Sequence, residues 1–224
     1  MKKMIICFIL VVVVILGGCN KPQPLKVEPT ELGFYDKKND IQYVMCSEKD
    51  VRPLEVGEEY ATDGKITYYK IPWEKTERFI CDSIEGVSYV YRALTVEDIT
   101  INNFNPVSAF IYLEGERSLY LDTLYCEQKY LPDDKKDENQ RDDSAIVYSI
   151  RDALISGERV NVAFEDMLPD DQYFIRLLSP DYPGLYYIVI FFTDINGEAY
   201  LRIRGEDITV LAPDIVELKM IDDD

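Results

Sequence analysis

Residues Leu185–Phe192 have the sequence LYYIVIFF, which contains only aliphatic and aromatic side chains. Such a run is typical of a central β-strand that is covered on both faces. Thr193–Gly197 (TDING) follows, and then Ala199–Arg204 (AYLRIR), in which Leu201 and Ile203 share one face. Because an Asn-Gly pair between two such runs favours a tight turn, the two runs are predicted to form a β-hairpin.

Two more hairpins are predicted upstream, from apolar residues that recur with a period of two. One joins Arg78–Asp82 to Val87–Tyr91, and the other joins Val107–Leu113 to Ser118–Tyr125. Shorter segments with the same period predict additional strands at Asp98–Ile101, Val160–Phe164, Tyr173–Leu178 and Ile208–Leu211.

A helix is predicted at about residues 144–156. Ser144 has the side chain of an N-cap, Gly157 is placed as a C-cap, and four apolar residues between them recur at helical spacing: Ile146, Val147, Ile150 and Leu154. A short helix at 213–220 is also compatible with the sequence. The predicted fold class is therefore α+β and β-rich, with antiparallel hairpins and a helix at 144–156.

The segment Asp133–Asp143, DDKKDENQRDD, has no apolar residue and is predicted to be an exposed acidic loop or linker. It follows a β-rich region at 32–132 and precedes a region of helix plus antiparallel sheet at 144–221. Residues 222–224 form an acidic tail. Two organisations stay open: one domain with an internal acidic loop, or two lobes divided near this segment.

The N-terminus has the features of an export signal. Lys2 and Lys3 precede an unbroken apolar run from Met4 to Leu16. This run is shorter than the roughly 20 residues that a membrane-spanning helix needs. The next residues complete the sequence Leu16-Gly17-Gly18-Cys19, which resembles the lipobox of bacterial lipoproteins.

The resemblance implies that residues 1–18 are a signal peptide and that diacylglycerol is attached to the sulfur of Cys19, the first mature residue. Two or more acyl chains anchor a protein stably to a membrane. Residues 19–31 contain Pro22, Pro24 and Pro29 and are predicted to be an extended tether. The expected location is the extracytoplasmic face of a bacterial membrane, with the membrane itself as a partner through Cys19.

The acidic composition bears on the partners. The chain has 42 Asp and Glu residues against 24 Lys and Arg, a net charge of −18, and removal of residues 1–18 would take away two lysines and no acid. Nucleic-acid affinity depends on neutralising phosphates with basic side chains, so no nucleic-acid partner is expected. High negative charge is commonly a feature of a solvated surface.

Several catalytic chemistries are excluded by composition. The chain has no histidine, which removes Ser-His-Asp and Cys-His catalysis and histidine-ligated metal sites. Cys46, Cys81 and Cys126 remain after lipidation, and their spacing matches no metal motif. Buried thiols are the favoured interpretation of these cysteines, and one disulfide is the alternative. No catalytic residue, cofactor or metal is predicted.

Carboxylates and one tryptophan are the remaining candidates. Asp181, beside Tyr182, and Glu165-Asp166 are the acids placed best for glycan hydrolysis, which uses two carboxyl groups. Asp194–Gly197 resembles a calcium loop only superficially, and a hairpin turn accounts for it. Trp73, the single tryptophan, is interpreted as a core residue, with ligand stacking as the alternative.

Three hypotheses of function follow. The favoured one is a non-catalytic, membrane-tethered module that binds a protein or a ligand from the envelope or environment, such as a glycan. The second is a structural or assembly subunit of an envelope complex, and the third is a carboxylate-dependent glycan hydrolase. An exposed aromatic patch would favour binding, an open apolar edge would favour assembly, and a buried carboxylate pair in a cleft would favour hydrolysis.

Overall fold

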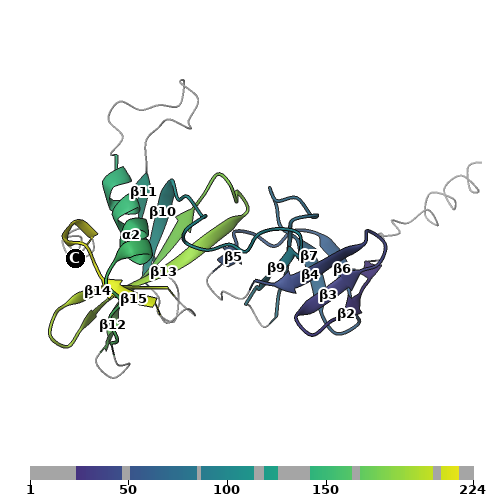
Figure 1. The fold of residues 1–224 in the computed structure, drawn as a ribbon, viewed down its shortest axis with the longest axis horizontal. Coiled ribbons are helices and arrows are strands. Elements are labelled where there is room, and N and C mark those ends of the chain that lie inside the picture. Colours follow the sequence, from purple (N-terminus) through teal and green to yellow (C-terminus); the bar gives the residue numbers. More distant parts are fainter. Residues whose placement is uncertain are drawn as a thin grey trace, which may run out of the picture.

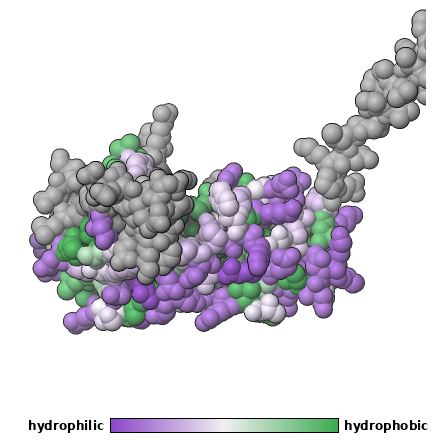
Figure 2. All heavy atoms as spheres, turned by 90° about the horizontal axis from the view of Figure 1, so that it is seen from above, coloured by the Kyte–Doolittle hydropathy of each residue, from purple (hydrophilic) through white to green (hydrophobic). Residues whose placement is uncertain are grey.

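The computed structural model describes residues 24–46, 51–84, 87–113, 119–125, 142–162, 167–203 and 208–216, with backbone only for Tyr125 and residues 167–171. The signal peptide, Cys19 and most of the acidic segment at 133–143 lie outside the described residues. Two sheets lie side by side along the long axis of the molecule (Figure 1). Hydrophilic residues cover much of the described surface, with hydrophobic residues in small patches (Figure 2). The β-rich character predicted from the sequence is confirmed.

The N-terminal sheet contains eight strands in the order β1-β6-β7-β8-β9-β4-β3-β2. Their bounds are β1 Leu25–Lys26, β2 Glu28–Pro29, β3 Gly33–Asp36, β4 Ile41–Met45, β6 Glu59–Thr62, β7 Thr67–Lys70, β8 Phe79–Asp82 and β9 Val90–Ala93. The two end strands, β1 and β2, are consecutive in the chain and separated by Val27 alone. Since β1 pairs with β6 and β2 pairs with β3, this segment joins both edges and closes the sheet on itself.

Aromatic rings fill the interior of the closed sheet. The ring of Phe34 lies 4.9 Å from that of Tyr43 and 4.0 Å from that of Tyr68, and Tyr68 lies 5.4 Å from Tyr91. All four side chains are buried in one cluster. Gly33 allows the close pairing of β3 with β4, because a Cβ atom there would lie 2.3 Å from the carbonyl oxygen of Tyr43.

The C-terminal sheet follows the order β11-β10-β12-β13-β14-β15, with β5 paired to the beginning of β13. The bounds are β5 Val51–Pro53, β10 Ser108–Leu113, β11 Leu119–Tyr125, β12 Met167–Leu178, β13 Leu185–Asp194, β14 Ala199–Ile203 and β15 Ile208–Leu211. All of these pairs are antiparallel. The predicted hairpins correspond to β8–β9, β10–β11 and β13–β14.

Helix α2 spans Ser144–Ser156, and its buried residues Val147, Ile150 and Leu154 pack on one face of the C-terminal sheet. The N-cap is Asp143, not Ser144 as predicted. Asp143 makes no side-chain capping hydrogen bond, whereas Asp142 accepts one from the N–H of Ser144 at 2.9 Å. Gly157 is the C-cap, as predicted, and its N–H donates to the carbonyl oxygen of Ala153.

The two sheets share one core. Phe79, Cys81 and Val90 on the outer side of the N-terminal sheet belong to the same buried cluster as α2 and the inner face of the C-terminal sheet. At the junction, Gly184 N–H donates to the carboxyl of Glu74 at 3.3 Å. A Cβ atom at Gly184 would lie 2.4 Å from the carbonyl oxygen of Pro72, so only glycine allows this approach.

Several sequence predictions differ from the structure. Residues 98–101 form no strand, because Asn103 bonds to the backbone of Asp98 and Thr100 and holds a turn. Ile99 and Ile101 are buried all the same, which explains the alternating pattern. Residues 160–162 also form no strand; the neighbouring Arg159 makes only an isolated bridge with Val210, and residues 163 and 164 lie outside the described range.

The segment boundaries predicted from the sequence differ from the observed strands at the N-terminus. The tether predicted at 19–31 includes β1 and β2, so the fold begins earlier than expected. The acidic segment at 133–143 lies between β11 and α2 in the chain and does not separate the two sheets, because β10, which precedes it, pairs with β12, which follows it. Residues 214–216 are helical and lie inside the predicted range 213–220, of which residues 217–220 lie outside the described residues.

No helix in the described part of the chain is long and apolar enough to span a membrane.

Candidate functional site

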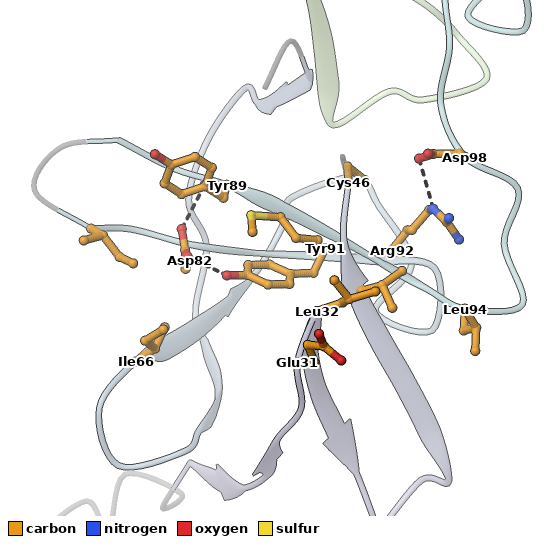
Figure 3. A pocket seen from close by; sticks show the side chains of 13 residues that line it. Glu31, Leu32, Cys46, Ile66, Asp82, Tyr89, Tyr91, Arg92, Leu94 and Asp98 are labelled. Carbon is orange, nitrogen blue, oxygen red and sulfur yellow. Dashed lines mark hydrogen bonds and ion pairs between the residues drawn. The ribbon is translucent and has the colours of Figure 1, made fainter. Parts of the chain in front are cut away.

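A pocket of about 710 Å³ lies at one end of the closed N-terminal sheet. Here it is called the N-terminal pocket, and it extends from Asp82 and Tyr89 at one end to Arg92, Leu94 and Asp98 at the other (Figure 3). Its walls are mostly aliphatic and aromatic. The full lining is Glu31, Leu32, Val44, Met45, Cys46, Ile66, Asp82, Ile84, Tyr89, Tyr91, Arg92, Leu94 and Asp98.

The rim of the pocket exposes large apolar side chains to water. Leu32, Met45, Ile84 and Leu94 have exposed fractions of 66%, 45%, 41% and 55%. They come from the segment before β3, the end of β4, and the residues just after β8 and β9. Exposed apolar side chains gathered around one concave surface are a typical feature of a binding site.

Asp82 is the buried polar group at one end of the pocket. One carboxylate oxygen accepts the backbone N–H of Tyr89 at 2.8 Å, and the other accepts the hydroxyl of Tyr91 at 2.9 Å (Figure 3). Burial raises the pKa of this carboxyl group above its usual value, although the two hydrogen bonds and the charge of Arg52 act against the rise. Burial and the neighbouring Asp82 also raise the pKa of Tyr91.

At the other end, Arg92 is held by two acceptors. Its Nε donates to Asp98 at 3.0 Å, and its Nη1 donates to the carbonyl oxygen of Val96 at 2.9 Å. The polar groups at both ends of the pocket are therefore already hydrogen-bonded within the protein. The pocket therefore suits a ligand that binds mainly through contacts of its apolar surface with the walls.

Two cysteines lie in the described residues. Cys46 and Cys81 both belong to the core shared by the two sheets, and Cys46 also lines the N-terminal pocket. Both are buried thiols. Burial, together with the charge of Asp82, raises the pKa of the Cys81 thiol to about 12, so this side chain is not a nucleophile near neutral pH. Cys126 lies outside the described residues.

Of the acids singled out in the sequence for glycan hydrolysis, the structure describes Asp181 alone. Asp181 is exposed and accepts a hydrogen bond from Asn105 at 3.0 Å, while Glu165 and Asp166 lie outside the described residues. Asp194 accepts the N–H groups of Asn196 and Glu198, and Gly197 has φ 81°, as the predicted hairpin turn requires. No cluster of three metal-ligating side chains occurs in the described ranges.

Trp73 is not in the core, contrary to the sequence-based prediction. Its side chain is 67% exposed, and its backbone φ of 67° lies in the left-handed region. Trp73 follows Ile71 and Pro72 in the turn between β7 and β8. Ile71 is the buried apolar residue of this turn. A bulky residue with positive φ is uncommon and indicates a turn fixed by its surroundings.

Sequence reasoning missed the N-terminal pocket. The strands β3 and β4 have four and five residues, which is too short for a clear period of two, and the pairing of β4 with β9 joins segments that are distant in sequence. One signal was present: Asp82 ends the run Phe79-Ile80-Cys81-Asp82, in which all four residues are buried. An acid that closes an apolar strand in this way is a candidate for a buried, hydrogen-bonded carboxyl group.

Comparison with known proteins gives no assignment, because no family model, no curated protein and no solved structure matches this chain.

Proposed function

We propose that this protein is a membrane-tethered, extracytoplasmic lipoprotein that acts as a non-catalytic binding module, with the N-terminal pocket as its ligand site. The observation that carries the proposal is the pocket itself: about 710 Å³, mainly apolar walls, and an exposed apolar rim. The ligand is a molecule or a protein segment that presents an aliphatic or aromatic group from the envelope or environment.

The pocket favours binding over hydrolysis. A glycosidase needs one carboxyl group as a proton donor and a second as a nucleophile or base, both in contact with the substrate. Asp82 has the raised pKa of a proton donor, but its side chain has no exposed surface and both oxygens already accept hydrogen bonds. Asp98 is paired with Arg92. These contacts give both carboxyl groups structural roles.

The tether supports the same function. An anchor at Cys19 would place the pocket near the membrane surface and raise its effective concentration for envelope ligands. Replacing Cys19 with Ala is expected to abolish the incorporation of labelled fatty acid and to leave an unprocessed precursor. Labelling that persists in this variant would contradict the lipoprotein assignment.

The binding experiment uses the purified mature protein and N-phenylnaphthylamine, a neutral probe whose fluorescence rises in apolar surroundings. Met45→Lys and Leu94→Lys place a charge on the exposed rim and should weaken probe binding by at least about tenfold, or 1.4 kcal/mol. Ile195→Lys is the matched control, because Ile195 is 61% exposed in the turn between β13 and β14, far from the pocket in the fold. Equal loss in all three variants would contradict the proposal.

A panel of envelope glycans and peptides, assayed in parallel for retention and for turnover, separates the binder from the hydrolase. Retention without turnover supports the binding module. Reproducible turnover that a single change such as Asp82→Asn abolishes would establish the hydrolase in its place.

The assembly hypothesis has one observation in its favour. β11 is an edge strand of the C-terminal sheet and pairs only with β10 in the described chain. Its residues Leu119 and Leu121 are exposed, and edge strands with apolar side chains are templates for pairing with another chain. Concentration-dependent self-association that Leu121→Lys abolishes would favour an assembly subunit.

A further inference from the structure

The C-terminal sheet has a second face, opposite the one that α2 covers. Residues paired directly across neighbouring strands point to the same side of a sheet. Phe110 pairs with Arg176, and Tyr112 pairs with Phe174, so β10 and β12 place these four side chains together. In contrast, Ala109 and Ile111 point the other way, into the core beneath α2.

Arg176 is held between two tyrosine rings on this face. Its guanidinium carbon lies 4.0 Å from the ring centre of Tyr112 and 4.9 Å from that of Tyr186. It makes no hydrogen bond or ion pair with the described residues, in contrast to Arg92 and Arg202. Its five N–H donors are therefore fixed in direction and available to a ligand.

Further aromatic rings extend the surface beside Arg176. The ring of Tyr120 on β11 lies 5.7 Å from that of Tyr112 and 6.4 Å from that of Phe110, both at steep angles. Tyr120 is 50% exposed, and Phe110 and Tyr112 are partly exposed. We call Phe110, Tyr112, Tyr120, Arg176 and Tyr186 the aromatic–arginine face.

The segments of β10, β12 and β13 that form this face contain no acid, although the protein is very acidic. Residues 108–113, 172–178 and 185–192 contain no Asp and no Glu, whereas the whole chain has 42; Asp122 on β11 pairs with Ile111, which faces the α2 side of the sheet. The charged side chain that these three segments contribute to the face is that of Arg176. The charge of this face is therefore complementary to an anionic ligand.

We propose that the aromatic–arginine face binds an acidic glycan, a chain of sugars that carry carboxylates. A guanidinium pairs with a carboxylate through two parallel N–H···O hydrogen bonds, and a planar group held by stacking loses little freedom on binding. The aliphatic C–H face of a pyranose ring packs on the exposed ring of Tyr120. This site is separate from the N-terminal pocket and adds to the proposed function.

Two other anionic polymers fit the same face less well. An extended peptide that joins a sheet needs free backbone groups, which a sheet presents at its edges and not on its faces. Single-stranded nucleic acid needs a groove of cations that follows successive phosphates. The segments 51–53, 108–113, 119–125, 172–178 and 185–192 contain no lysine and two arginines, Arg52, which pairs with Tyr186, and Arg176.

The test measures binding to the purified mature protein by calorimetry at low salt. The probes are hexagalacturonate, a neutral galactose hexamer, hexaglutamate and a thymidine hexanucleotide. The expected result is that hexagalacturonate binds more tightly than the other three and that added NaCl weakens it. No binding of hexagalacturonate, or equal or tighter binding of any of the other three, would overturn the proposal.

Variants identify the residue responsible. Arg176→Gln should lower the affinity for hexagalacturonate by at least about tenfold, and Arg176→Lys should lower it as well, because lysine keeps the charge but not the two-pronged geometry. Tyr120→Ala, at an exposed ring, should weaken binding and leave the thermal unfolding temperature unchanged. Arg151→Gln is the matched control, since it makes the same charge change on α2, on the other side of the sheet. Equal effects of Arg176→Gln and Arg151→Gln would refute a site at Arg176.

Discussion

Two aspartates at opposite ends of the closed N-terminal sheet show how local hydrogen bonding sets the charge of a buried acid. Asp82 and Asp36 both have no exposed surface. Burial raises the pKa of both, but Asp36 accepts hydrogen bonds from the hydroxyl of Tyr60, from the side chain of Asn39 and from two backbone N–H groups. These bonds outweigh burial and lower its pKa, whereas Asp82, with two donors, keeps a raised pKa.

The lowered pKa of Asp36 predicts a pH dependence of stability. A carboxyl group whose pKa is lower in the folded state stabilises the fold fully when the pH is above its unfolded-state pKa, here 3.8. This stabilisation is lost as the pH falls through the pKa of the folded state. Asp36→Asn should therefore lower the free energy of unfolding by about 1–3 kcal/mol at pH 7. The difference from the unchanged protein should shrink below about pH 4.

Denaturant unfolding at pH 7 and pH 3 measures this difference. Asp40→Asn is the control in the same turn, where the side chain is exposed and asparagine tolerates the φ of 58°. A deficit of Asp36→Asn that stays constant between the two pH values would contradict the assignment.

At the residue scale, burial was easier to predict than partners. Ile99 and Ile101 were recognised as apolar positions and are buried, but the prediction of a strand there was wrong because Asn103 fixes a turn. Trp73 was interpreted as a core residue because a tryptophan in a β-rich domain is more often buried, yet Pro72 and the approach of Gly184 fix the turn that exposes it. Such contacts depend on residues far away in sequence.

At the scale of elements, the hairpins were predictable because a turn and its two strands are adjacent in the chain. β13 and β14 follow from Leu185–Phe192 and the Asn-Gly turn. The closed N-terminal sheet was not predictable in the same way. β3, β4, β6 and β7 have only four or five residues each, and the parallel pairing of β1 with β6 joins distant segments. The N-terminal pocket depends on this closure, so it was missed with it.

The closing segment should be a weak point of the N-terminal sheet. Val27 lies between β1 and β2, is buried in the aromatic interior, and donates its N–H to Thr62. Val27→Asp would bury a charge within the apolar cluster that contains Val27 and Phe34, and it should lower the free energy of unfolding by about 2–4 kcal/mol. Glu28→Ala is the control, because Glu28 is exposed on β2.

Val27→Asp should also open the sheet between β1 and β6, and amide hydrogen exchange in β1, β2 and β3 reports this opening. Exchange as slow as in the unchanged protein, together with unchanged stability, would show that β1 and β2 do not close the sheet.

At the scale of the whole molecule, the two sheets form one folding unit. β5 lies between β4 and β6 in the chain but is a strand of the C-terminal sheet, and the buried cluster continues across both sheets. The sequence left open whether the segment at 133–143 divides two lobes, because composition shows where a chain is polar and not which strands pair across the polar part.

Cleavage within the acidic segment should leave the fold assembled. Its sequence offers trypsin Lys135, Lys136 and Arg141 in a stretch without apolar residues, so it is expected to be cut first. The two fragments should stay together, because β10 from the first fragment pairs with β12 from the second over six residue pairs. Size-exclusion chromatography should give one peak that separates only in denaturant. Spontaneous separation of the fragments would contradict a shared sheet.

The position of β5 has a consequence for the order in which the molecule can assemble. A chain is made from its N-terminus, so β5 and the N-terminal sheet exist before β12 and β13 have been synthesised. Until then β5 has no partner strand, and Phe79 and Val90 have no C-terminal sheet to cover them. Transiently exposed apolar surface makes a nascent chain prone to aggregate. A holding chaperone would therefore be needed most while the last third of the chain is still being made.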